Sequence, residues 1–221
     1  MINKYILGDA FQYLPQLKDQ SVDLLFTSVP DLSEVKGKKE SVEFYMKFLD
    51  KFVLQANRII KKDGFIVLSQ TDRRFKGQII PKHNEFINRF CSIGFKLKDY
   101  KIMVKDSVDK KNLFRLNYSH VLIFTKNGKI PTEKRKGKYL TDVWVYPYPN
   151  GSQFDQSYSD MIVSTFTNKD DYVVDPFAGR GTVLRSCITL NRKYLGIEYD
   201  KNIYDKNYVS GGNLKKWLNS N

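Results

Sequence analysis

The chain has 221 residues, enough for one domain with a full hydrophobic core. Two cysteines exclude a disulfide framework, and no apolar run is long enough for a membrane span or a secretory leader. We therefore expect an intracellular protein in a reducing compartment, either cytoplasm or nucleoid/nucleus, without a membrane partner. The net charge of +13 and a pI near 9.5 favour a polyanionic partner such as nucleic acid.

Apolar runs typical of buried strands alternate along the chain with segments of helical periodicity. A long amphipathic helix is expected between Ser41, a plausible N-cap, and Lys61–Lys62 ahead of Gly64. Residues 71–82 and 126–138 have the composition of basic loops. The alternation predicts an α/β fold with a mostly parallel sheet covered on both faces. The predicted strands are 4–8, 21–27, 65–69, 95–105, 120–125, a run from 172 and 194–198, and the shorter helices are 10–17, 83–91, 157–165 and 183–190.

The stretch from Tyr172 to Thr182, Y-V-V-D-P-F-A-G-R-G-T, has the pattern of a strand, a glycine turn and the start of a helix. Such a corner receives anions in nucleotide-type folds, because backbone N–H groups at the helix N-terminus point at the ligand. Gly179-x-Gly181 could begin a dinucleotide fingerprint, but Leu184 stands at its third glycine position.

An acid at the start of this corner argues against a dinucleotide. Asp175 would repel a pyrophosphate but would tolerate a ligand that carries a sulfonium and an ammonium group. S-adenosylmethionine is such a ligand. Its carboxylate could use the N–H groups of the turn, and its ribose diol could use Glu198.

Several motifs together resemble S-adenosylmethionine-dependent DNA amino-methyltransferases of the N4-cytosine/N6-adenine type. D-P-F-A-G-R-G-T followed by R-K-Y-L-G-I-E is similar to their cofactor motif. I-L-G-D-A and S-V-D-L-L-F-T-S-V-P resemble the opening segment of the class whose catalytic motif precedes its cofactor motif, and H-V-L-I-F-T-K and D-V-W also resemble that class. The resemblance implies a Rossmann-like methyltransferase fold, with a mostly parallel seven-stranded sheet and permuted motif order. It also implies one methyltransferase domain over residues 1–221.

The resemblance implies a cofactor site for S-adenosylmethionine built from both ends of the chain. Asp9 would contact the adenine amino group, Glu198 the ribose hydroxyls, and the glycine corner the methionine part. The cofactor-binding residues predicted in this way are Asp9, Ala10, Asp175, Pro176, Phe177, Ala178, Gly179, Gly181, Thr182, Glu198 and Tyr199.

The catalytic motif is expected at Ser28-Val29-Pro30-Asp31, where the family has Ser/Asp/Asn-Pro-Pro-aromatic. An exocyclic amine is a poor nucleophile, and hydrogen-bond acceptors such as the Ser28 hydroxyl and the Val29 carbonyl would draw its lone pair out of the base. The first proline is missing, and Asp31 replaces the aromatic that stacks on the flipped base. Phe44, Tyr45 or a residue from Tyr146 to Tyr148 could cover the base instead.

Three interpretations of this departure stay open. Asp31 could contact an unusual acceptor, another residue could supply the stacking, or the chain could be a non-catalytic relative that binds nucleic acid or a partner. Serine at the first position slightly favours cytosine N4 over adenine N6, and DNA is preferred over RNA.

Sequence selectivity is expected to be low or to depend on a homodimer or a partner subunit. Residues 106–140 form a short basic insertion in place of a full target-recognition region. No metal site is predicted, because Cys91, Cys187, His83 and His120 lack ligand-like spacing. The residues predicted to contact phosphates are Arg73, Arg74, Lys76, Lys134, Arg135 and Lys136.

Overall fold

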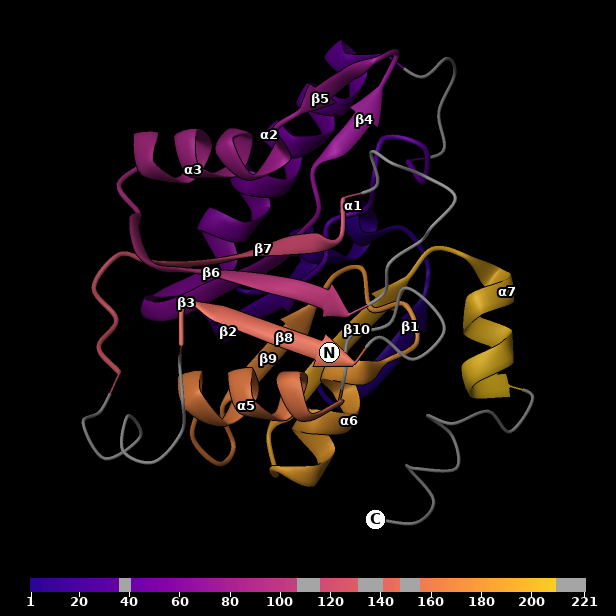
Figure 1. The fold of residues 1–221 in the computed structure, drawn as a ribbon. Helices are drawn as coiled ribbons and strands as arrows, with labels where there is room; N and C mark the ends of the chain where they lie inside the picture. The colour runs from indigo at the N-terminus through magenta and orange to yellow at the C-terminus, as the bar shows by residue number, and fades with distance from the viewer. Residues whose placement is uncertain (36–40, 107–115, 131–140, 148–155, 210–221) are drawn as a thin grey trace.

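The computed structural model describes residues 1–35, 41–106, 116–130, 141–147 and 156–209. Their core is a single eight-stranded sheet in the order β1-β10-β9-β2-β3-β7-β6-β8, with a separate β4-β5 hairpin. Figure 1 shows helices above and below this sheet. The strands are β1 Lys4–Leu7, β2 Val22–Thr27, β3 Ile60–Gln70, β4 Arg73–Phe75, β5 Gln78–Ile80, β6 Lys96–Asp106, β7 Tyr118–Thr125, β8 Val143–Pro147, β9 Tyr172–Asp175 and β10 Lys193–Glu198. The helices are α1 Ala10–Tyr13, the 3-10 turn η1 Leu14–Gln16, α2 Val42–Ile59, α3 Lys82–Ser92, α5 Gln156–Phe166, α6 Thr182–Thr189, α7 Lys201–Tyr204 and the π-helical turn η2 Asp205–Val209.

The mostly parallel sheet is confirmed. In the sheet, β7 is the strand that runs antiparallel to both of its neighbours, β3 and β6, and the remaining pairs are parallel. The predicted number of strands was wrong, because β8 adds an eighth strand beside β6. Its alternation is clear only in the fold: Trp144 is buried between the exposed Val143 and Val145. Its position at the edge of the sheet also suits a proline-bearing strand.

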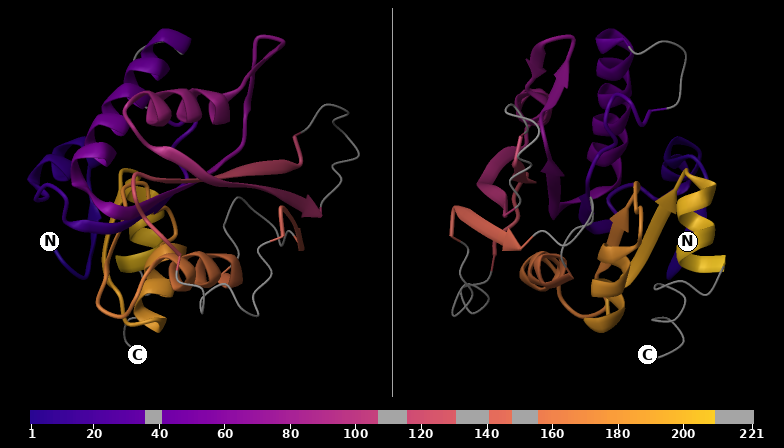
Figure 2. Two further views of the ribbon diagram at one scale, coloured as in Figure 1. Left: turned by 90° about the vertical axis from the view of Figure 1, so that its left-hand side faces the viewer. Right: turned by 45° about the vertical axis from the view of Figure 1, so that its right-hand side comes forward.

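Two hydrophobic clusters fill the two sides of the sheet. One side packs against α2 and α3 through residues such as Leu49, Phe52 and Phe90, and the other packs against α5 and α6 through Ile162 and Leu184. The two further views in Figure 2 show the same layered arrangement. Helices on both faces follow from the near-continuous apolar strands, which have no polar face to show to water.

The long helix α2 begins as predicted. Ser41 is its N-cap and accepts the N–H of Phe44 at 3.0 Å. Its predicted end at Lys61–Lys62 was wrong, because the helix stops at Ile59 and Ile60 already pairs with Val22 on β2. Strand pairing therefore overrides the helical propensity of the two lysines.

The segment predicted as a loop over residues 71–82 contains the hairpin β4-β5. Lys76 and Gly77 connect its strands with positive φ angles of 48° and 81°, the geometry that two-residue hairpin turns require. In Figure 1 the hairpin stands at the top of the molecule, beside the N-terminal part of α2. Among the described residues, no helix is both long and apolar enough to cross a bilayer.

The position of the site is decided where β2 and β9 lie side by side. They pair in parallel, with Leu24 opposite Val173 and Leu25 opposite Val174. Both chains therefore leave the sheet at the same edge, one into Ser28 and the other into Pro176. This is the switch point of an open α/β sheet, the place where such folds bind their ligands.

Candidate active site

The glycine corner after β9 is closed by its own hydrogen bonds. Gly179 and Gly181 have positive φ angles of 52° and 74°, a conformation that side chains other than glycine rarely adopt. The predicted free N–H groups of the turn are largely absent here, because four of them already donate within the protein. These bonds are Phe177 N to Asp175 Oδ1, Ala178 N to Ile197 O, Gly179 N to Glu198 Oε2 and Gly181 N to Ala178 O.

Glu198, at the end of β10, connects the corner to the next segment of chain. Its two carboxylate oxygens accept the N–H groups of Gly179 at 2.8 Å and Asp200 at 2.6 Å. Burial raises its pKa, and these backbone bonds act against that rise. Each carboxylate oxygen can accept more than one hydrogen bond, so Glu198 keeps capacity for two ligand hydroxyls.

Asp175 is buried at the junction of the two strands. The Thr27 hydroxyl donates to its Oδ1 at 2.6 Å and thereby links the end of β2 directly to the corner. Burial, reinforced by the nearby Glu198, raises the pKa of Asp175 to about 7, against the hydrogen bonds from Thr27 and the Phe177 N–H. A cation at the junction would favour the ionised form of this acid.

Asp9 follows β1 and is the N-cap of the short helix α1. Its carboxylate accepts the Phe11 N–H at 2.9 Å. The preceding Gly8 donates its N–H to the Glu198 carbonyl at 2.8 Å, so the N-terminal segment lies beside the acid that ends β10. Two acids separated by 189 positions in the sequence are thus brought to one place by the pairing of β1 with β10.

A pocket of about 330 Å³ opens between these segments, at the lower end of the size range of small-molecule sites. Six of the predicted site residues line it, namely Asp9, Ala10, Pro30, Pro176, Phe177 and Tyr199. Asp175, Ala178, Gly181, Thr182 and Glu198 lie behind this lining as buried supports. Eight further lining residues were not predicted, namely Gly8, Phe11, Glu34, Val35, Phe44, Lys47, Phe48 and Lys51. The amphipathic pattern of α2 had marked its apolar face as core, so its part in a pocket carried no separate signal.

The lining of this pocket fits S-adenosylmethionine. Phe177 packs against Phe48, with ring centroids 5.9 Å apart, and Phe48 against Phe11 at 5.3 Å, so that an aromatic wall is available to an adenine or a sulfonium. Asp9 supplies an acceptor for an amino group. Lys47 and Lys51, one turn apart on α2, supply cations for a carboxylate.

The segment after β2 holds Ser28 at the surface. Ser28 is exposed, and its hydroxyl has no hydrogen-bond partner in the part of the chain that the structure describes. The carbonyl of the buried Val29 accepts Gln70 Nε2 at 3.2 Å, so one of its lone pairs is already used. Tyr45 is 1% exposed and donates its hydroxyl to the Pro30 carbonyl at 3.0 Å, which excludes it as a cover for the base.

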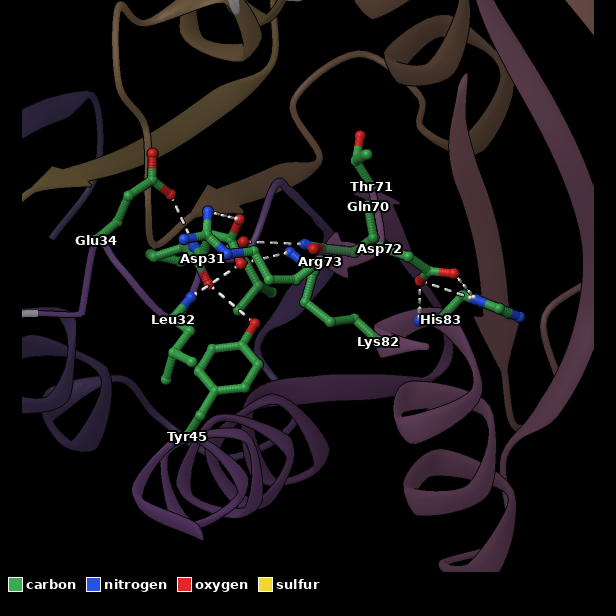
Figure 3. Close-up of polar contacts among 12 residues, drawn as sticks. Asp31, Leu32, Glu34, Tyr45, Gln70, Thr71, Asp72, Arg73, Lys82 and His83 are labelled. Atoms are coloured by element: carbon green, nitrogen blue, oxygen red, sulfur yellow. Dashed lines mark hydrogen bonds and ion pairs between the residues drawn. The ribbon is translucent and has the colours of Figure 1, made fainter. Parts of the chain in front are cut away.

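Asp31, at the position of the family's aromatic, is held between two cations. Its carboxylate lies 3.2 Å from Arg73 Nη1 and 3.2 Å from Lys82 Nζ (Figure 3). Lys82 is 3% exposed, and burial lowers its pKa against the attraction of Asp31. The backbone N–H of Asp31 donates to Glu34 Oε2 at 2.7 Å. Asp31 is therefore engaged in ion pairs inside the protein.

Next to this ion pair, the two histidines converge on Asp72. His83 Nδ1 lies 2.8 Å from Asp72 Oδ2, and His120 Nε2 lies 3.3 Å from the same oxygen. No sequence pattern indicated this cluster, because the three residues lie on the segment after β3, on α3 and on β7. Burial raises the pKa of Asp72, but the bonds from His120 and His83 outweigh it and lower the pKa to about 2.

The three possible ligand atoms of this cluster lie within 4.8 Å of one another, as in a metal site. The imidazole rings are stacked, however, with centroids 4.0 Å apart and planes 21° apart. A zinc ion bound about 2 Å from both nitrogens would stand well out of at least one ring plane. The arrangement instead suits two N–H donors that share one carboxylate.

The predicted phosphate contacts are divided between described and undescribed segments. Arg73 and Arg74 lie on β4, and Lys76 lies at the exposed tip of the hairpin. Lys134, Arg135 and Lys136 lie outside the described residues. Part of the predicted 106–140 insertion, Tyr118–Thr125, is the central strand β7, and most of the rest is outside the described residues.

The order of the strands and the pocket at the switch point define an α/β protein of the nucleotide-dependent methyltransferase class. Solved structures agree with this fold. A PvuII DNA methyltransferase (cytosine-N4-specific) superposes with a TM-score of 0.78 at 19% identity, covering 89% of this chain and 82% of the other. A DNA modification methylase from Thermus thermophilus, solved with S-adenosyl-L-methionine, gives 0.75 at 24% identity over 94% and 92%.

Curated relatives include the Type II methyltransferases M.BglII of Bacillus subtilis and M.BamHI of Bacillus amyloliquefaciens. They are 25% and 24% identical over 94% and 89% of this chain. The chain spans 68% of the length of the first and 54% of the second. The model of the N6/N4 DNA methylase family matches residues 22–208, and the chain belongs to this family. The resemblance found in the sequence is thereby confirmed, together with the expectation of a methyltransferase that uses S-adenosylmethionine.

Proposed function

We propose that the protein transfers a methyl group from S-adenosylmethionine to an exocyclic amino group of a base in DNA, with cytosine N4 preferred over adenine N6. One observation carries the proposal. The segment that starts with Ser28 and the corner that starts with Asp175 leave adjacent parallel strands, and the bond from Thr27 to Asp175 joins them. The pocket beside this junction is lined by Pro30 from one segment and Pro176 from the other.

In this mechanism Ser28 acts on the acceptor amine. Its hydroxyl oxygen accepts a hydrogen bond from one amino hydrogen, and the second lone pair of the Val29 carbonyl accepts the other. Both bonds favour a tetrahedral nitrogen whose lone pair is free to attack. Gln70 holds the Val29 carbonyl in place from behind.

The cofactor, when bound, supplies an electrophilic methyl group on a sulfonium. The amine nitrogen forms a bond to the methyl carbon as the carbon–sulfur bond breaks. The sulfur keeps the electron pair and becomes a neutral thioether, and the nitrogen then loses a proton to water. The chain's contribution is to hold the reactants in line and to exclude water with the aromatic wall of Phe11, Phe48 and Phe177.

DNA is the proposed polymer because the chain is basic and belongs to a DNA methylase family. Arg74 and Lys76 on the hairpin are proposed to contact phosphates, which positions a strand without reading its sequence. The preference for cytosine N4 rests on serine at the first motif position. Selectivity for a sequence is proposed to be low, or to be supplied by a second copy or a partner subunit.

A non-catalytic nucleic-acid-binding role is the second candidate. It is favoured by the ion-paired Asp31 in place of the stacking aromatic. Mass spectrometry of nucleosides from DNA and from RNA incubated with the protein and the cofactor separates the two. Methylated cytosine or adenine from DNA supports the proposal. Cofactor binding by calorimetry without a product on either polymer favours the second candidate.

A further inference from the structure

Asp31 leaves the motif without its stacking ring, and the structure offers a replacement on the hairpin. We propose that Arg73, held in place by Asp31, supplies the flat face against which the target base lies. The inference rests on the proposed function, since it concerns the same acceptor site. It assigns the contact with the base to Arg73 and gives Asp31 a positioning role.

Arg73 lies where the missing ring would be. Its Nη1 is 3.2 Å from Asp31 Oδ2, so the guanidinium stands at the motif position where the family has an aromatic side chain. Figure 3 shows Arg73 extending from the base of the hairpin toward Asp31. The side chain is 31% exposed, which leaves part of its surface open to a ligand. Lys82, the other cation on Asp31, is 3% exposed and has no comparable open surface.

The guanidinium group also has the chemistry that this contact requires. It is planar, delocalised and weakly hydrated, and arginine planes stack on unpaired bases much as aromatic rings do. An ammonium group is a compact point charge that cannot do so. The carboxylate of Asp31 offsets the positive charge of Arg73, which would otherwise oppose the charge that develops on the attacking amine.

Arg73 carries an unsatisfied donor as well. Its Nε is buried and has no hydrogen-bond partner among the described residues. A buried donor without an acceptor is costly, and a flipped nucleotide brings phosphate, sugar and base oxygens that could accept this bond.

The neighbouring contacts fix the direction of the side chain. Asp72, one residue before Arg73, is clamped by His83 and His120, and Lys82, one residue before His83, pairs with Asp31. Both ends of the hairpin are thus tied down within one residue of Arg73 or Lys82. This gives the guanidinium the rigid support that a stacking platform requires.

The test uses Arg73→Lys, which keeps the positive charge and the partner of Asp31 but removes the planar face. We expect about a tenfold loss in kcat/KM for methylation and a similar loss in oligonucleotide affinity, the size of one stacking contact. Affinity is measured by fluorescence anisotropy with S-adenosylhomocysteine present. The matched control is Arg89→Lys on α3, whose carboxylate partners are Asp50 and Glu85, and it should behave as wild type.

A double-mutant cycle sharpens the test. Asp31→Tyr restores an aromatic, so adding Arg73→Lys to it should change affinity by less than about twofold. Circular dichroism confirms that each variant is folded, and Arg73→Lys alone decides the matter if the tyrosine variants are not.

Equal affinity and turnover of Arg73→Lys and wild type overturn the inference. So does a loss confined to Phe44→Leu, since Phe44 is 40% exposed and lines the pocket. If wild type methylates nothing, the proposed function fails, and the affinity measurements still decide the role of Arg73.

Discussion

The cofactor corner and the catalytic segment lie beside each other but are stabilised in different ways. The corner is held by backbone hydrogen bonds and by two acids, Asp175 and Glu198, and its sequence follows the family pattern. The catalytic segment departs from that pattern, and its Asp31 is held by side-chain ion pairs from the hairpin and from α3. Backbone bonds constrain the local sequence, whereas ion pairs are made with distant residues. The first region could therefore be recognised by a motif, and the second could not be understood without its partners.

The largest expected effect separates the two regions outright. Ser28→Ala removes the acceptor for the amine hydrogen and should lower kcat by about 100-fold or more, the size seen when one transition-state hydrogen bond is lost. Calorimetry should give an unchanged dissociation constant for the cofactor. Ser28→Thr keeps the hydroxyl and should retain much of the activity. Full turnover by the alanine variant would remove Ser28 from the mechanism.

The next effect tests the support of the catalytic side. Asp72→Asn leaves His83 and His120 without their shared carboxylate and should cost about 2 kcal/mol, or a Tm roughly 4–8 °C lower. The pKa of Asp72 is lowered to about 2, so its contribution is complete above the unfolded pKa of about 4 and is lost as the pH falls toward 2. The difference in Tm between the variant and wild type should therefore shrink below about pH 4. A constant difference down to pH 2 would contradict the charge interpretation.

A chelator tests the same cluster without a mutation. Because the stacked rings suit hydrogen bonding to Asp72, EDTA should leave the Tm unchanged, and added zinc should not raise it. A stabilisation by zinc that disappears in the Asp72→Asn variant would show that the cluster is a metal site.

A smaller effect is expected at the cofactor side. Glu198→Gln keeps one acceptor oxygen for the Gly179 N–H but loses the other, so cofactor affinity should fall by about tenfold. The value of kcat at saturating cofactor should change much less. Isothermal calorimetry together with saturation kinetics distinguishes this outcome from a general loss of folding, in which both would fall.

The smallest effect is a pH dependence of cofactor binding. The pKa of Asp175 is raised to about 7 by burial, and a bound cation favours its ionised form. Affinity should therefore rise with pH up to about 7 and level off above it, with protons released on binding. Thr27→Val removes a bond that lowers this pKa and should move the plateau to higher pH. Calorimetry in buffers of different ionisation enthalpy measures the protons, and an affinity independent of pH over roughly one unit on either side of that pKa would contradict the role of Asp175.

The sequence by itself determined the fold class, the order of the motifs and the cofactor corner. These are set by local rules: apolar runs, helix caps such as Ser41, and glycines at positive φ, each visible within a few residues. It also located the departure at Asp31. The eighth strand, the hairpin within 71–82 and the early end of α2 escaped it, because each depends on a partner strand.

Only the tertiary structure decided what surrounds Asp31. Arg73 and Lys82 lie 42 and 51 positions away from it in the sequence, and the two histidines meet at Asp72 across 11 and 48 positions. Spacing along the chain carries no information about such contacts when they join separate strands and helices. The physical reason is that side-chain ion pairs are made between elements that the sheet brings together, and no local propensity requires them.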